Sequence, residues 1–210
     1  ASQDETFELA LGYLQVNPNA KIKVFKNEKN RGYGGNQILG YQYFMDKGFD
    51  VVVLLHGDGQ YAPEILAHMY HPLVEGKADA VFGSRMMKEF GGPLVGGMPL
   101  YKYVGNRILT FFENRALNLN LTEFHSGYRA YSRKALEMVN FEANSEDFVF
   151  DNEIIVQMHL KGLRFKEIPV STRYSFDCSS VRFGQGVVYG LGILNTIVRY
   201  FVHITGIHRY

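Results

Sequence analysis

The stretch VVVLLHGDGQYAPE, residues 51–64, decides the fold and raises the question of function. Its apolar run leads into Asp58, which has a glycine on either side. A near-continuous apolar run is typical of a parallel strand covered on both faces. Pro63 then opens a helix at a position where its missing N–H costs nothing. Because ligands of open parallel sheets bind beyond the carboxyl ends of the strands, we expect Asp58 to face a ligand.

The segments around this stretch alternate between helical and strand patterns. We expect a helix over residues 7–14 capped by Ser2 or Asp4, a strand over 20–27, a helix ending near Gly48, and a buried strand over 78–85. This alternation predicts an α/β fold with an open, mostly parallel, Rossmann-like sheet and helices on both faces.

After Arg85 the alternation stops. Residues 88–99 contain four glycines and two prolines, which predict a long mobile loop. The elements expected after it are a helix over 101–117, a short strand over 127–132, a helix over 151–162 and a strand over 164–174.

The composition is that of an ordinary globular chain, with 46% hydrophobic and 20% charged residues. The net charge of +1 gives no general attraction to nucleic acid, and we expect no nucleic-acid partner. The single cysteine, Cys178, excludes an intrachain disulfide and a cysteine metal cluster, and it fits a reducing, cytoplasmic compartment. The first residues carry neither a Met nor a signal peptide, and we expect a fragment that begins within a domain.

The C-terminal residues differ in character from the rest. Residues 183–198 carry no charge, and no acidic residue follows Asp177. Since a membrane-spanning helix needs about 20 apolar residues, this glycine-interrupted stretch predicts a helix on a membrane surface or against a missing partner segment. The alternative is a terminal helix packed on its own domain. We therefore divide the chain into a domain of residues 1–177 and a helical segment of residues 178–210.

Asp58 and Gln60 are the candidate metal ligands. A carboxylate and an amide oxygen at this spacing suit Mg²⁺ or Mn²⁺, which bind oxygen ligands and share them with a diphosphate. The alternative is a turn aspartate that caps the helix starting at Pro63.

Two glycine-containing segments are candidates for binding phosphate. NRGYGGN, with Asn30, Gly32 and Gly34, is either a phosphate- or base-contacting turn before a helix N-terminus or a plain turn. Ser84 and Arg85 close the strand of residues 78–85 at the same edge as Asp58. Arg85 suits bidentate phosphate contact, with a surface ion pair as the alternative.

Two polar clusters occur in the second half of the chain. TEFHSGYRAYSR gathers Glu123, His125 and Arg129, and His125 is either a proton acceptor near neutral pH or a structural histidine. Asp151 and Glu153 open a helix, where acids either bind substrate or complement the helix dipole.

In order and spacing, these segments resemble family 2 glycosyltransferases, in the branch of dolichyl- and polyprenyl-phosphate sugar synthases. The segments are NRGYGGN, HGDGQ, GSR, SGYRAYSR, and DNEI before RFKEIPV, and they span most of the chain. The resemblance implies the GT-A fold and an inverting, metal-dependent transfer from a nucleotide-diphosphate sugar. The acceptor would be a polyprenyl phosphate or a cell-surface glycan, at the cytoplasmic face of a membrane.

The resemblance also implies roles for residues. Asp58, assisted by Gln60, would bind the metal and donor diphosphate, although His56 replaces the first carboxylate of the family's motif. Arg85 and Arg129 would face donor or acceptor phosphates. Glu123 would be the acceptor-side acid, with His125 as its rival.

The resemblance includes a departure at the start of the chain. ASQDET resembles the tail of the family's DDGSTDGT turn, so we expect the strand before it to be absent and the isolated fragment to be inactive. Two alternatives are a nucleotidyltransferase and a non-catalytic nucleotide-sugar-binding module. His56 in the metal motif favours the second.

Overall fold

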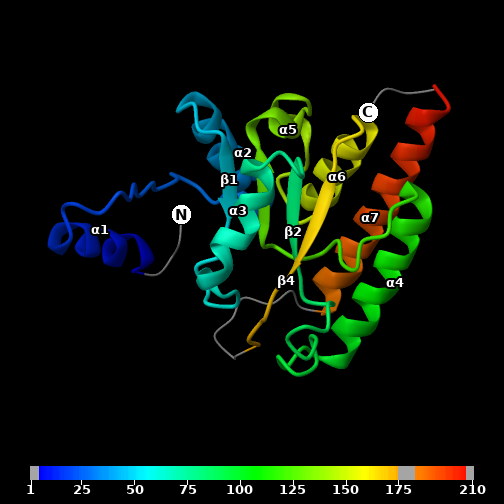
Figure 1. Ribbon diagram of the computed structural model, residues 1–210, viewed down its shortest axis with the longest axis horizontal. Helices are drawn as coiled ribbons and strands as arrows, with labels where there is room; N and C mark the ends of the chain where they lie inside the picture. Colours follow the sequence, from blue (N-terminus) through cyan, green and yellow to red (C-terminus); the bar gives the residue numbers. More distant parts are fainter. Residues whose placement is uncertain (1–4, 175–182, 207–210) are drawn as a thin grey trace.

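The computed structural model describes residues 5–174 and 183–206 (Figure 1). Its elements are α1 (Thr6–Val16), α2 (Gly32–Asp46), β1 (Val51–Leu54), η1 (Pro63–Ile65), α3 (Leu66–Val74), β2 (Ala80–Ser84), α4 (Leu100–Leu117), β3 (Arg129–Ser132), α5 (Arg133–Glu137), η2 (Phe141–Ala143), α6 (Phe150–Leu160), β4 (Phe165–Pro169) and α7 (Phe183–Ile204). The expected α/β class is confirmed.

The sheet has the order β1-β3-β2-β4. β3 is antiparallel to both of its neighbours, β1 and β2, whereas β2 and β4 are parallel. Two of the three strand pairings are therefore antiparallel, which differs from the mostly parallel sheet expected. β1, β2 and β4 nevertheless run in the same direction. The reason is that β3, which comes later in the chain, inserts between two strands that the sequence presents as consecutive.

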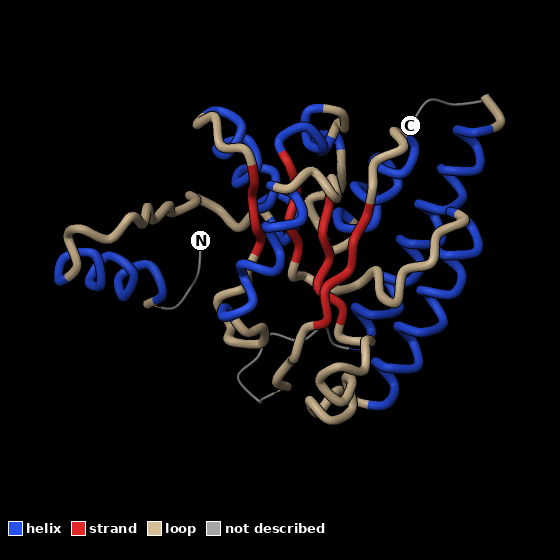
Figure 2. The backbone as a smooth tube through the Cα atoms, viewed as in Figure 1, coloured by secondary structure: helices blue, strands red, loops and turns tan. Residues whose placement is uncertain are grey.

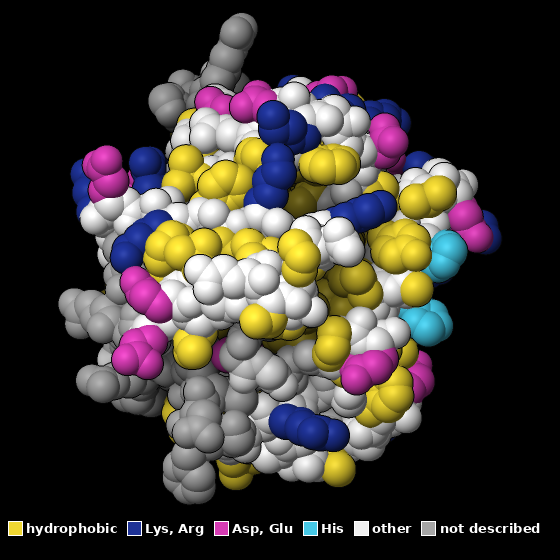
Figure 3. Space-filling model, turned by 90° about the vertical axis from the view of Figure 1, so that its left-hand side faces the viewer, with side chains coloured by type: hydrophobic (Ala, Val, Ile, Leu, Met, Phe, Trp, Pro, Cys, Tyr) yellow, Lys and Arg dark blue, Asp and Glu magenta, His cyan; other side chains and the backbone are white. Residues whose placement is uncertain are grey.

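The N-terminal segment differs from expectation. α1 forms as predicted, but it buries no residue and projects from the domain (Figures 1 and 2). Its expected caps lie outside the described residues. Residues 20–27 form no strand, because no described segment pairs with their backbone groups. On this side of the molecule, hydrophobic side chains lie open between lysines and arginines (Figure 3).

The sheet buries side chains on both faces. Ala80 and Phe82 of β2 belong to a core beneath α2 and α6, while Val81 belongs to a second core beneath α3. This division follows the two-residue period of a strand. β2 is fully buried, as its apolar run predicts, whereas β1 is half-buried.

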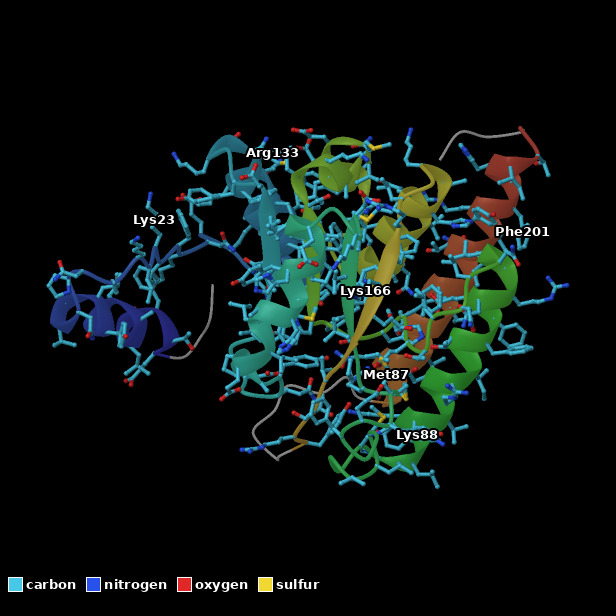
Figure 4. All side chains as sticks on the ribbon, viewed as in Figure 1. Lys23, Met87, Lys88, Arg133, Lys166 and Phe201 are labelled. Atoms are coloured by element: carbon cyan, nitrogen blue, oxygen red, sulfur yellow. The ribbon has the colours of Figure 1, made fainter. Side chains whose placement is uncertain are left out.

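α4 and α7 pack together beside the sheet (Figure 1). The buried side of α4 is largely polar, with Asn106, Thr110 and Glu113. Most exposed side chains of both helices are apolar: Leu100, Tyr101, Val104, Ile108, Phe111 and Phe112 on α4, and Val187, Val188, Leu191, Leu194, Val198, Phe201 and Ile204 on α7. Arg107 and Arg115 of α4 and Arg199 of α7 are exposed as well. We call the apolar side chains the outer apolar face, and Figure 4 shows Phe201 on the outer side of α7.

α7 forms within the expected C-terminal helical segment. Gly184–Ile204 is the one stretch among the described helices that is long and apolar enough to cross a membrane, with a mean hydropathy of 1.4. α7 also packs on α4 and α6, as the packed-helix alternative predicts. The proposed boundary at residues 177–178 lies outside the described residues.

Candidate functional site

A cavity of about 580 Å³ lies between the strand ends, α4 and α7. Its lining comes from segments far apart in the chain. It includes Tyr33, His56, Gln60, Tyr61, Arg85, Met98, Tyr101, Lys102, Asn106, Leu109, His125, Phe148, Asp151, Tyr174, Gln185, Val187 and Tyr189. Of the predicted site residues, the structure therefore brings Gln60, Arg85, His125 and Asp151 together.

The loop after β1 forms one end of the cavity. Asp58 is half-buried in this loop but is not among the side chains that line the cavity, and its Oδ1 accepts the backbone N–H of Gln60 at 3.0 Å. Burial lowers the pKa of His56, against the opposing charge of Asp58. In the described ranges, no three His, Cys, Asp or Glu side chains are grouped so that they could hold a metal ion. The oxygens of Asp58 and Gln60 nevertheless fit a hard cation that takes its remaining ligands from phosphate and water.

Arg85 and Glu123 form a buried ion pair behind another wall of the cavity. The Nε of Arg85 donates to Glu123 Oε1 at 2.8 Å, and its backbone N–H donates to Oε2 at 2.7 Å. Asn106 donates to the same carboxylate at 2.7 Å. Burial opposes ionisation, but the Arg85 charge and these hydrogen bonds lower the pKa of Glu123. Since Glu123 is only 1% exposed and does not line the cavity, the structure makes it the counter-ion of Arg85.

Arg129 is not among the side chains that line the cavity, so its predicted phosphate contact and catalytic role are not supported by this geometry. It is 1% exposed, and its guanidinium donates to the carbonyls of Ser126 at 2.8 Å and Phe124 at 2.5 Å. Its Nε also lies 3.3 Å from Asp151 Oδ2. A guanidinium held by backbone carbonyls positions the chain around it. Asp151 does line the cavity, where it accepts a hydrogen bond from Tyr33 at 2.9 Å.

His125 lies at the junction of α4, α6 and α7. Its Nδ1 is 3.0 Å from the hydroxyl of Tyr189, and its Nε2 is 3.1 Å from Glu113 Oε2. The backbone carbonyl of His125 accepts from Arg85 Nη2 at 3.1 Å. These contacts join His125 to the Arg85 wall.

Most of the NRGYGGN segment is the first turn of α2, which begins at Gly32. Asn30 Oδ1 accepts the N–H of Gly32 at 2.9 Å and so starts α2. A Cβ on Gly32 would lie 2.4 Å from the backbone oxygen of Glu146. A Cβ on Gly34 would lie 2.3 Å from the backbone oxygen of Ser145. These glycines permit close backbone approach to residues 145–146. Tyr33 of the same segment lines the cavity, and ligand contact by Asn30, Gly32 and Gly34 stays a prediction.

Ser84 and Glu153 are also structural. Ser84 is fully buried and lies 2.6 Å from the hydroxyl of Thr122. Glu153 accepts from the backbone of Ser145 and from Arg199 of α7 at 2.9 Å. Neither residue lines the cavity, so their predicted substrate contacts are not supported.

Sequence reasoning missed the contribution of α4. Burial, and then the nearby charge of Arg85, lower the pKa of Lys102. The available signal was the helical spacing of Lys102, Asn106 and Glu113, which places a polar stripe along one side of α4. Tyr174 and Tyr189 were not predicted because they reach the site from distant segments.

Comparisons with known proteins place this geometry in a family. The sequence profile described as "Glycosyl transferase family 2" matches residues 1–139. The UDP-N-acetylglucosamine–dolichyl-phosphate N-acetylglucosaminyltransferase of Methanococcus voltae is 32% identical over 82% of this chain and 67% of its own length. The undecaprenyl-phosphate mannosyltransferase of Micrococcus luteus is 28% identical over 81% of this chain and 68% of its own length.

Solved structures share the fold. Glucosyl-3-phosphoglycerate synthase from Mycobacterium tuberculosis, in complex with phosphoglyceric acid, has a TM-score of 0.62 and 15% identity over 95% of this chain. This chain covers 66% of that one, so it spans about two thirds of the structure it matches. A complex of the same enzyme with Mn²⁺, UDP-glucose and glycerol 3-phosphate gives a TM-score of 0.59. The expected GT-A fold is confirmed.

Proposed function

The chain belongs to glycosyl transferase family 2, and we propose that it transfers a sugar from a nucleotide-diphosphate sugar to a polyprenyl phosphate at a membrane surface. The chain is a glycosyltransferase. Two of its relatives are named as sugar transferases that act on dolichyl phosphate and undecaprenyl phosphate. The observation that carries the proposal is a cavity whose lining joins two cations, Arg85 and Lys102, to apolar side chains of α4 and α7.

The donor belongs at the β1 end of the cavity. Asp58 and Gln60 would hold Mg²⁺ or Mn²⁺ together with the donor diphosphate. The cation, when bound, supplies charge stabilisation to the leaving diphosphate. The oxygen ligands and the half-buried position of Asp58 support this assignment.

The acceptor phosphate belongs at Arg85 and Lys102. The Arg85 charge is already matched by Glu123, so Lys102 supplies the additional positive charge for an incoming anion. Burial and the Arg85 charge lower the pKa of Lys102. A bound phosphate would oppose this shift, because its negative charge favours the protonated lysine. The adjoining apolar lining, Leu109 and Val187, suits a prenyl chain.

A single displacement with inversion fits the carboxylates at the site. Asp151 lines the cavity, but its oxygens accept from Tyr33 at 2.9 Å and Gln37 at 3.1 Å. Glu123 is held by Arg85. Neither is placed to attack the sugar. A prenyl phosphate is already an anion and needs no strong base, so this arrangement favours it over a glycan hydroxyl.

The outer apolar face supports membrane contact. A surface helix of a soluble domain normally turns its apolar side inward. α4 does the reverse, with Glu113 3% exposed and Phe111 64% exposed. Because the same two helices line the acceptor end of the cavity, we assign this face to the lipid surface that carries the acceptor, on the cytoplasmic side.

The reaction is tested with the full chain, labelled uridine- and guanosine-diphosphate sugars, Mn²⁺ or Mg²⁺, and a short polyprenyl phosphate. We expect a sugar-phosphate-prenyl product that requires the metal, and no product with the corresponding prenol. Lys102→Met should raise the KM for prenyl phosphate, whereas the exposed control Lys161→Met should not. Transfer to a glycan hydroxyl alone would overturn the acceptor assignment.

Membrane contact is tested by flotation with liposomes. We expect Ile108→Asp combined with Phe111→Asp to abolish binding. Val74→Asp is the matched control because Val74 is 66% exposed but lies on α3, away from the outer apolar face. Equal liposome binding by the wild-type protein, the Ile108→Asp, Phe111→Asp double variant and Val74→Asp would contradict the assignment of this face to lipid.

A further inference from the structure

Arg85 lines the cavity, but most of its hydrogen-bond donors are already engaged. Its Nε proton and one Nη2 proton are donated to Glu123, and the other Nη2 proton is donated to the carbonyl of His125 at 3.1 Å. One Nη1 proton is donated to the hydroxyl of Tyr174 at 2.8 Å. Since a guanidinium has five N–H groups, a single Nη1 proton is left for a ligand. Arg85 therefore cannot bind a phosphate with two parallel hydrogen bonds unless it gives up one of these contacts.

The hydroxyl of Tyr174 adds a donor beside Arg85. Its oxygen accepts the Arg85 proton, and no residue within 5–174 or 183–206 accepts its own proton. Burial raises the pKa of Tyr174 to about 12, against the opposing charge of Arg85, so the hydroxyl keeps its proton at neutral pH. A hydroxyl that accepts from a charged donor is polarised and becomes a stronger donor itself. Because Tyr174 lines the cavity, a ligand bound there can accept this proton.

Tyr61 provides a second hydroxyl of the same kind. It is 3% exposed and lines the same cavity. Its oxygen accepts from the backbone N–H of Gly127 at 3.1 Å and from Ser126 Oγ at 3.4 Å, which occupies both lone pairs. In the part of the chain that the structure describes, nothing accepts the Tyr61 proton. A buried hydroxyl proton without an acceptor costs free energy, and a ligand oxygen in the cavity would remove that cost.

The backbone holds the two tyrosines near Arg85. Tyr61, in the loop after β1, pairs with Thr172 in an antiparallel bridge. Tyr174 lies two residues beyond Thr172, and its backbone N–H donates to the carbonyl of Gly96 at 3.0 Å. Besides burial, Arg85 lowers the pKa of Tyr174 and Tyr61 raises it. Because such electrostatic effects weaken with distance, they agree with the three side chains lying close together.

We propose that the hydroxyls of Tyr61 and Tyr174 both donate hydrogen bonds to the acceptor phosphate, while Arg85 adds one N–H and holds the Tyr174 hydroxyl. This inference rests on the proposed function, since it takes the acceptor to be a prenyl phosphate. The three donors match the three terminal oxygens of a phosphate monoester. The product of transfer is a phosphodiester, which has two such oxygens and less charge. The same donors therefore favour the substrate over the product.

Calorimetric titration of the full chain with a short prenyl phosphate, without donor or metal, tests these contacts apart from turnover. Tyr174→Phe removes the hydroxyl and keeps the backbone hydrogen bond to Gly96. We expect it to bind prenyl phosphate about tenfold more weakly, because it loses one hydrogen bond to a charged group. Tyr61→Phe should show a similar loss. Tyr70→Phe, on α3 and outside the cavity, is the control and should bind as the wild-type protein does.

Two further measurements separate phosphate contact from a structural role. The wild-type protein should bind prenyl phosphate more tightly than its methyl diester, and this preference should shrink in Tyr174→Phe. In the transfer assay, the KM for prenyl phosphate should rise in Tyr174→Phe while the KM for the nucleotide sugar stays constant. A rise in the nucleotide-sugar KM alone would show that the hydroxyl serves the donor, and would overturn the proposal.

The binding data distinguish failure of this inference from failure of the proposed function. If the wild-type protein binds prenyl phosphate and both Phe variants bind it as tightly or more tightly, the hydroxyls do not contact phosphate and only this inference is overturned. If the wild-type protein binds none, the acceptor assignment fails, and this inference fails with it. If Tyr61→Phe does not fold because the Gly127 N–H loses its acceptor, Tyr174→Phe decides.

Discussion

Replacing Glu123 with Gln tests whether this residue is a structural counter-ion or a catalytic acid. The Arg85 side chain is 11% exposed and that of Glu123 is 0% exposed. Glutamine keeps the shape of Glu123 and one acceptor oxygen but removes the charge, so Arg85 is left buried without a carboxylate. Breaking a buried pair in this way costs about 3–5 kcal/mol. For a chain of this size, that corresponds to a fall in Tm of about 6–20 °C.

Urea denaturation followed by circular dichroism measures the loss, with the exposed Glu142→Gln as a control expected to change stability by less than about 0.5 kcal/mol. An unchanged m value would show that the loss is one of stability and not of denatured-state compactness. The double variant Arg85→Met, Glu123→Leu removes both charges and should regain most of the stability, yet bind prenyl phosphate poorly.

The counter-ion assignment has a clear refutation. If Glu123→Gln stays within about 1 kcal/mol of wild-type stability while kcat falls by 10³ or more, Glu123 acts in the chemistry of transfer. That result would restore the role that the family resemblance implied for it.

Three further predictions concern the metal, the loop and acid stability. Asp58→Asn should lower metal-dependent turnover by about 10²-fold or more with the fold intact, while Asp46→Asn should not, and wild-type turnover of the first variant at saturating Mn²⁺ would refute its metal role. Donor plus metal should protect the loop of residues 88–98 from limited proteolysis, because its glycines permit closure over the cavity, and unchanged cleavage there would exclude a lid. The hydrogen bond from Arg164, opposed by burial, lowers the pKa of Asp79, so this pair should stabilise the fold above about pH 4 and lose its effect as the pH falls further. Asp79→Asn should therefore lose stability at pH 7 and little at pH 2, and an equal loss at both would contradict the ionic account.

Most elements of the fold could be predicted from local patterns. The buried strand β2, the proline-opened helix after β1, and helices α4 and α6 form where periodicity placed them. These patterns work because a strand or helix shows its buried side through the spacing of its apolar residues. The strand expected over residues 20–27 did not form, because a strand needs a neighbour and its sequence pattern cannot supply one.

The candidate site was predicted in part. Gln60, Arg85, His125 and Asp151, which line the cavity, were identified because strand ends and dense polar clusters leave a mark in the sequence, whereas Asp58 does not line it. The sequence does not show which polar residues line a cavity and which pair with each other. These contacts depend on residues that are distant in the chain. Glu123 is paired with an arginine 38 positions earlier.

The sequence alone determined the family, the α/β class and the strand end that carries Asp58, because these are set by residues close together in the chain. Only the tertiary structure decided that β3 inserts between β1 and β2, and that the Arg129 guanidinium donates to backbone carbonyls. Likewise, only packing brings Lys102 and Tyr189 to one cavity and turns the apolar side of α4 outward. The physical reason is that burial and charge pairing are properties of the space between segments, and that space exists only once the chain has folded.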